Sequence, residues 1–151
     1  MVKKGVLLGG VLGILVAVLA AGCAGGGALS KKQYVSKLNA MCRDFSRQER
    51  EIGEPQTLDD LVAKGPRILD AFEQAIADKV GNLKASDEIS DQADRLAVIA
   101  DQQRDVLGEL VDAAKSNDVA KVGELVSKNQ ALNKESGSIA RKLGAEACAE
   151  G

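Results

Sequence analysis

The sequence predicts an all-α fold: an up-down-up-down four-helix bundle with a kinked second helix, closed by one disulfide. Three observations lead to this prediction. Apolar residues recur at helical spacing in four segments after residue 30, no segment alternates apolar and polar residues as a strand does, and turn residues separate the segments. Long helices joined by short turns pack as neighbours that alternate in direction.

The first two expected helices have clear start signals. The first begins at Ser30, which can cap its first turn while Gln33 reaches back as a capping box, and it ends at residues 53–55. The second begins at Thr57 and is interrupted by Gly65-Pro66. Because the ring of a proline collides with the carbonyl four residues earlier, we expect a kink or a break at this point.

The last two expected helices are separated by a turn at residues 116–118. The third helix is expected from Ser86 to about Lys115 and has the most regular apolar stripe in the chain. The fourth follows the turn and ends at Gly144, because glycine readily takes the left-handed conformation that ends many helices.

The N-terminus has the pattern of an export signal. A lysine pair at positions 3–4 precedes an uncharged, mostly apolar stretch at residues 5–27. Within it, Leu19-Ala20-Ala21-Gly22-Cys23 places small residues directly before a cysteine, and this motif resembles the lipobox of bacterial lipoproteins. The resemblance implies a diacylglycerol on the Cys23 thiol and cleavage after Gly22.

The expected domain organisation follows from this pattern: a signal peptide at 1–22, a Gly/Ala tether at 23–29 and the bundle at 30–151. The tether spans at most about 20 Å, so the bundle is expected on the extracytoplasmic face of the bacterial envelope, attached to the membrane through the Cys23 lipid. Two alternatives stay open. One is an uncleaved membrane-spanning helix, which the glycines of the stretch disfavour. The other is ordinary secretion without a lipid.

The composition excludes several function classes. The sequence has no histidine and a formal net charge of -2. Without histidine there is no histidine general base, no di-iron Glu-x-x-His pair, and no histidine-ligated haem or zinc. Mild acidity and few aromatic residues argue against nucleic-acid binding. We therefore expect no enzymatic activity, no cofactor and no metal site.

Two cysteines remain besides the lipidated one. Cys42 lies on the inner face of the first expected helix, and Cys148 follows the end of the fourth. Outside the cytoplasm an even pair is most simply a disulfide. The first and last helices of such a bundle are neighbours, which makes the bond feasible. A redox-active pair and two free thiols are the alternatives.

The mature chain also contains three recognisable motifs. They are YVSKLNAMC at residues 34–42, Asn117-Asp118 before the last helix, and LGAEAC at residues 143–148. Together they resemble small helical lipoproteins of unassigned function that are common in actinobacteria. The resemblance implies a helical bundle with Cys42 paired to Cys148, and it implies no activity.

Three features are candidates for binding. The first is a ridge of aspartates on the outer face of the third expected helix, which could attract a cationic partner, a peptide or a divalent ion. A charged outer face is also normal for an amphipathic helix. The members of this aspartate ridge are Asp87, Asp91, Asp94, Asp101, Asp105 and Asp112.

The other two candidate features lie inside the bundle. Gln103, Asn129 and Ser136 occupy core positions, where they either hydrogen-bond a ligand or satisfy one another and fix helix register. The interruption at Gly65-Pro66 either opens an apolar cleft that hosts a ligand or is a tolerated kink.

Two functions remain open after these exclusions. The leading hypothesis is a non-enzymatic, membrane-anchored module that binds a protein partner or a small ligand. The alternative is a structural or regulatory envelope accessory without a ligand. A closed bundle with an exposed apolar patch would favour a protein partner. A pocket of several hundred Å³ near Pro66 would favour a small ligand.

Overall fold

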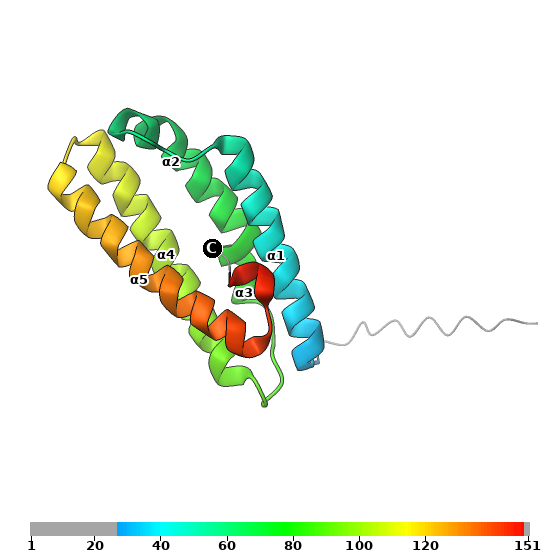
Figure 1. The fold of residues 1–151 in the computed structure, drawn as a ribbon. Coiled ribbons are helices and arrows are strands. Elements are labelled where there is room, and N and C mark those ends of the chain that lie inside the picture. Colours follow the sequence, from blue (N-terminus) through cyan, green and yellow to red (C-terminus); the bar gives the residue numbers. More distant parts are fainter. Residues whose placement is uncertain (1–26, 150–151) are drawn as a thin grey trace, which may run out of the picture.

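The computed structural model describes residues 27–149, and the regular secondary structure of this part is helical (Figure 1). A π-helical turn and the short α3 continue α2, and a 3-10 turn follows α5. The all-α fold class with four main helices is therefore confirmed. The elements are α1 (Lys31–Ile52), α2 (Leu58–Phe72), the π-helical turn (Glu73–Ala77), α3 (Asp78–Val80), α4 (Ser90–Lys115), α5 (Val119–Leu143) and the 3-10 turn (Glu146–Cys148).

Helix α1 begins and ends where the sequence predicts. The Ser30 backbone N–H donates to Gln33 Oε1 at 3.0 Å, and the Gln33 N–H donates to Ser30 Oγ at 3.4 Å, which completes the capping box. At the other end, Gly53 has a φ of 81° and its N–H donates to the Glu49 carbonyl at 2.9 Å. The positive φ turns the chain out of the helix, and glycine adopts it without a steric penalty.

Helix α2 begins after its predicted cap, but it is not broken at Pro66. The Thr57 side chain accepts the Asp60 N–H at 3.1 Å, and the helix continues past Pro66 to Phe72. The irregular turn lies after Phe72 and is π-helical. Close packing explains the continuity, because a Cβ on Gly65 would lie only 2.8 Å from Val111 Cγ2 of α4. The contact with α4 holds α2 in place beside the proline.

A Gly65→Ala substitution should therefore lower the free energy of unfolding by about 1 to 3 kcal/mol, because its methyl group overlaps Val111 and the two helices must move apart. The matched control is Gly123→Ala in α5, where an added Cβ would meet no atom within 4 Å. That control should raise the free energy of unfolding by up to about 1 kcal/mol through helix propensity. Urea denaturation measures both changes, and equal stabilities of the two variants would contradict the packing argument.

Helix α4 begins at Ser90, so the predicted start at Ser86 is wrong by one turn. The Leu29 N–H donates to the Lys84 carbonyl at 2.7 Å, and the Ser86 N–H donates to the Leu29 carbonyl at 2.9 Å. These bonds hold residues 84–86 extended beside the start of the described chain, in an isolated bridge between Leu29 and Ala85. The helix can begin only after the turn that follows this bridge.

Helix α5 has the predicted boundaries. The Asp118 carboxylate accepts the Lys121 N–H at 3.0 Å and caps the first turn. After Leu143, Gly144 has a φ of 87° and ends the helix in the left-handed conformation.

The four main helices pack in a chain of neighbours: α1 on α2, α2 on α4, and α4 on α5. Helix α1 meets α5 mainly through the C-terminal residues 145–149, which lie between them in Figure 1. We call residues 145–149 the C-terminal strap. One core cluster surrounds Tyr34 and Phe72, and a second surrounds Val106 and Leu125. The side of the bundle between α1 and α5 is thus closed where the strap lies.

Candidate binding site

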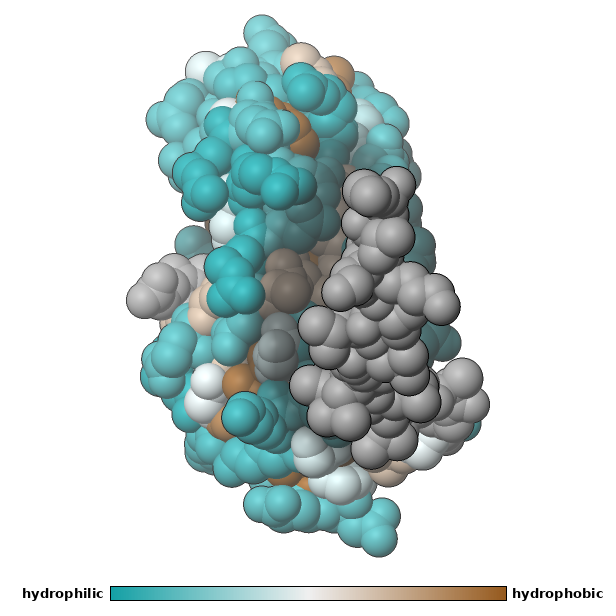
Figure 2. Space-filling view, turned by 90° about the vertical axis from the view of Figure 1, so that its right-hand side faces the viewer, coloured by the Kyte–Doolittle hydropathy of each residue, from teal (hydrophilic) through white to brown (hydrophobic). Residues whose placement is uncertain are grey.

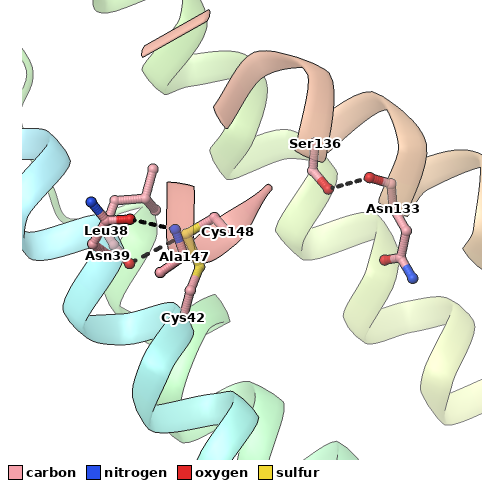
Figure 3. The surroundings of a disulfide bond; sticks show 7 residues. All are labelled: Leu38, Asn39, Cys42, Asn133, Ser136, Ala147 and Cys148. Carbon is pink, nitrogen blue, oxygen red and sulfur yellow. Dashed lines mark hydrogen bonds between the residues drawn. A yellow bond between two sulfur atoms is a disulfide. The ribbon is translucent and has the colours of Figure 1, made fainter. Parts of the chain in front are cut away.

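The C-terminal strap is fixed to α1 by a disulfide between Cys42 and Cys148, whose Cα atoms are 5.3 Å apart (Figure 3). Beside it, the Ala147 N–H donates to Asn39 Oδ1 at 2.9 Å. The Cys148 sulfur also lies 3.4 Å from the Leu38 carbonyl oxygen. This is a van der Waals contact and not a hydrogen bond, because a disulfide sulfur carries no hydrogen. The predicted pairing of the two cysteines is confirmed.

A small cavity of about 130 Å³ lies beside the disulfide. Apolar side chains from α1, α2, the π-helical turn and α4 form most of its wall. Its polar lining comes from Ser46 of α1, Gln103 of α4, and Asn133 and Ser136 of α5. The volume corresponds to a few water molecules rather than to a typical organic ligand.

Three polar residues of this cavity, Gln103, Asn133 and Ser136, are joined by hydrogen bonds. Gln103 is buried, and its Nε2 donates to Asn133 Oδ1. The Ser136 hydroxyl donates to the Asn133 carbonyl at 3.1 Å (Figure 3). The sequence predicts Gln103 and Ser136 at core positions but gives no reason to single out Asn133, which links them. These bonds favour the interpretation that the residues fix the register of α4 against α5.

A larger cavity of about 560 Å³ lies away from the disulfide. It is lined by the end of α1, by α2, by the end of α4 and by the start of α5. We call it the distal groove. Most of its lining is apolar, and the polar members include Gln56, Thr57 and Asn129. Its main apolar residues are Leu58, Leu61, Ile68, Leu107, Leu110, Val111, Val119, Val122 and Val126.

The predicted polar set is divided between the two cavities. Asn129 lines the distal groove, whereas Gln103 and Ser136 line the small cavity. The Asn129 Oδ1 atom is buried and has no hydrogen-bond partner among the described residues. A buried acceptor without a partner is uncommon in folded proteins and costs stability. Among the described lining residues of the groove, it is the buried side-chain polar atom that lacks a partner.

The mouth of the distal groove is acidic. Glu49 and Glu54 are the charged side chains among its described lining residues, and both are exposed. Partial burial raises the pKa of Glu49, the nearby Glu54 raises it further, and Arg50 partly offsets both effects. An additional negative charge at the mouth would be repelled.

Tyr34 has the second buried polar atom without a partner, its hydroxyl oxygen. The residue is fully buried in the core next to the strap and lines neither cavity. Burial, with a smaller contribution from Asp94, raises its pKa to about 12. The phenol thus stays protonated at physiological pH and acts as a core side chain.

All six aspartates of the ridge are exposed, but Asp87 lies in the turn before α4 and only the other five lie on the helix. Arg104 pairs with Asp101 at 3.1 Å and with Asp105 at 3.6 Å, and Lys115 pairs with Asp112 at 3.5 Å. Within residues 27–149, no group of carboxylates and cysteines is arranged to hold a metal ion. The ridge is a solvated helix face whose charges are partly balanced by its own helix.

The surface view in Figure 2 is mostly hydrophilic, with small and separate apolar areas. Large apolar side chains with substantial exposure in the described chain are Val62, Val98, Val119 and Val126. Two of them, Val119 and Val126, line the distal groove. Two of these four exposed valines thus belong to the groove, and the four do not form a broad apolar patch.

The predicted anchor lies outside the described residues. This applies to Cys23, Gly22 and the signal segment at 1–22. Between residues 27 and 149, no helix combines the length and the apolar character needed to cross a membrane. Comparisons of the chain with protein-family models, with curated proteins and with solved structures find no match.

Proposed function

We propose that this protein is a lipid-anchored, non-enzymatic binding module on the extracytoplasmic face of the bacterial envelope, and that its distal groove holds a small apolar ligand. The observation that carries the proposal is the groove itself, with a volume of about 560 Å³ and a largely apolar lining. Ligand sites typically measure 300 to 1,000 Å³ and have few polar groups. The groove includes Gly65, next to the proline where the sequence places a candidate cleft.

The sequence supports the anchored part of the proposal. The motif ending in Gly22-Cys23 resembles a lipobox, and the mature chain resembles small actinobacterial lipoproteins. A disulfide between Cys42 and Cys148 fits an oxidising compartment outside the cytoplasm. A tether of about 20 Å at most would keep the bundle near the lipid surface.

The position of the distal groove supports binding of a ligand outside the bilayer. Helix α1 starts next to the tether and ends at the groove, and its 22 residues correspond to roughly 33 Å. The groove is therefore about 30 Å along the molecule from the point where the tether ends and α1 begins. A ligand could enter it without the bundle entering the membrane.

We also propose how the helices run relative to one another. We take the four main helices to alternate in direction as an up-down-up-down bundle, with a bend in α2 at Pro66. The short connections at 53–57 and 116–118 support the alternation, and the proline ring supports the bend. Spin-label distances between helix ends, and along α2, test both points.

Photocrosslinking in membrane vesicles that contain the full chain tests the binding function. A diazirine-bearing hydrocarbon probe should label peptides from α2, α4 and α5 that line the distal groove. Val126→Trp should lower this labelling about tenfold, because an indole there fills the space in which the probe binds. Val126 is 38% exposed and lines the groove, so a larger side chain is tolerated at this position.

The matched control is Val98→Trp, since Val98 is 47% exposed on α4 and lines neither cavity. It should leave the labelling unchanged. If the wild-type groove is not labelled, or if both variants are labelled like the wild type, the groove does not bind apolar molecules. The alternative function, an envelope accessory without a ligand, would then be preferred.

A further inference from the structure

The chemistry inside the distal groove restricts the class of ligand, an inference that rests on the proposed function. Asn129 of α5 lines the groove, and its buried Oδ1 has no partner in the described chain. A side-chain amide accepts through its oxygen and donates through its nitrogen. A ligand hydroxyl both donates and accepts, so it can satisfy this amide in either orientation.

Near the start of α2, the capping interactions engage two polar groups, while the Gln56 side chain is exposed at the surface. The Thr57 hydroxyl oxygen accepts the Asp60 N–H at 3.1 Å. The Gln56 N–H in turn donates to Asp60 Oδ2 at 3.1 Å. Asn129 differs from both, because its side-chain oxygen is buried and lacks a partner in the described chain, so it is the group that would gain most from a polar atom of the ligand.

Charge restricts the ligand further. A carboxylate head would approach the acidic mouth formed by the exposed Glu49 and Glu54, where like charges repel. An ammonium head would be attracted to Glu49 and Glu54 at the mouth, but to bind beside Asn129 it must leave them and meet a neutral amide instead. Burying a charge without an opposite partner is strongly unfavourable.

We infer that the distal groove selects an uncharged apolar molecule with a hydroxyl group, that Asn129 binds this hydroxyl, and that Glu49 and Glu54 exclude anionic analogues. Long-chain alcohols represent this class, in contrast to fatty acids and to hydrocarbons or ethers without a donor group. The apolar part of the molecule packs against the leucines and valines of α2, α4 and α5.

Competition against the hydrocarbon photoprobe, with the full chain in vesicles, tests this inference. Dodecanol, dodecyl methyl ether, dodecanoate and dodecylamine share one chain and differ in the head group. Dodecanol should halve the labelling at about a tenfold lower concentration than the ether, which accepts but does not donate a hydrogen bond. Dodecanoate and dodecylamine should also be weaker competitors than dodecanol.

Two sets of variants assign the selectivity to residues. Asn129→Leu should remove the preference for dodecanol over the ether, while Gln130→Leu, at the exposed neighbouring position, should retain it. Glu49→Gln combined with Glu54→Gln should make dodecanoate a several-fold stronger competitor. Formation of the Cys42–Cys148 disulfide checks that each variant is folded.

The outcomes separate this inference from the proposed function. If the wild-type groove is labelled but dodecanol competes no better than the ether, dodecanoate or dodecylamine, the ligand class is wrong and the binding function stands. An unchanged dodecanol preference in Asn129→Leu overturns the role of Asn129. If the groove is not labelled at all, both proposals fail.

Discussion

Replacing Cys42 and Cys148 together with alanine should lower the free energy of unfolding by about 4 kcal/mol. The bond joins residues separated by 106 positions, so it closes a loop that contains nearly all of the described domain. Without it, the unfolded chain gains the entropy that the cross-link removes. Since domains of this size are stable by only about 5 to 15 kcal/mol, this is a large fraction of the total.

Thermal unfolding of the double variant and of the wild type, each with and without reductant, measures this effect. The oxidised wild type should melt more than about 10 °C above both the variant and the reduced wild type. Reductant should leave the variant unchanged. A double variant that melts with the oxidised wild type would contradict a stabilising role for the bond.

The same experiment separates the two cavities. The C-terminal strap contributes Ala147 and Cys148 to the small cavity, and it contributes no residue to the distal groove. Below its melting temperature, the double alanine variant should therefore keep probe labelling in the groove. The strap should become more sensitive to proteases, because its remaining anchors include the Asn39 and Arg141 hydrogen bonds.

The helix boundaries that were predicted correctly depend on local chemistry. The capping box of Ser30 and Gln33, the Asp118 cap and the left-handed Gly144 each involve residues a few positions apart. Such interactions depend little on the rest of the fold, so a single sequence is sufficient to find them.

The incorrect start of the third helix depends on a contact between distant residues. Ser86 resembles a helix cap, yet its N–H bonds to Leu29, more than 50 positions away in the chain, and the helix starts later. At Pro66 the sequence leaves a kink and a break open, and the structure excludes the break, with Gly65 packed closely against Val111 of α4. Neither contact leaves a signal in local spacing.

The candidate site was predicted in part. The sequence leaves open whether the Gly65-Pro66 interruption opens a cleft or is a tolerated kink, whereas the distal groove lies where α5 packs on α4 without also packing closely on α1 or α2. Helical periodicity places Asn129 and Gln103 inside the bundle. It cannot show that Gln103 finds a partner in Asn133 while Asn129 Oδ1 has none.

Replacing Cys23 with serine should abolish lipid attachment. If the motif before Cys23 acts as a lipobox, its thiol is the acceptor of the diacylglycerol, and the cleavage after Gly22 follows acylation. The variant should therefore accumulate as the uncleaved precursor without bound fatty acid. Each buried methylene contributes about 0.8 kcal/mol to membrane binding, so loss of the acyl chains removes the main anchor of the mature protein.

Metabolic labelling with an alkyne fatty acid, together with the intact mass of the chain, provides the measurement. Membrane fractionation alone is insufficient, because an uncleaved signal segment also holds a chain in the bilayer. Ala24→Ser is the control, since it alters the next residue and should leave labelling and cleavage intact. Normal labelling of the Cys23→Ser variant would exclude Cys23 as the attachment site.

The disulfide provides an independent test of export in the same cells. If the precursor form of Cys23→Ser still crosses the membrane, its Cys42 and Cys148 should be oxidised as in the wild type, because the bond depends on the compartment and not on the lipid. Mass mapping without reductant should find the linked peptides in both proteins. Free thiols in the wild type, with the whole chain in the soluble cell interior, would remove the basis for the anchor. Free thiols only in Cys23→Ser would mean that the bundle of this variant stays in the cytoplasm. Lipid attachment would then have to precede translocation of the bundle.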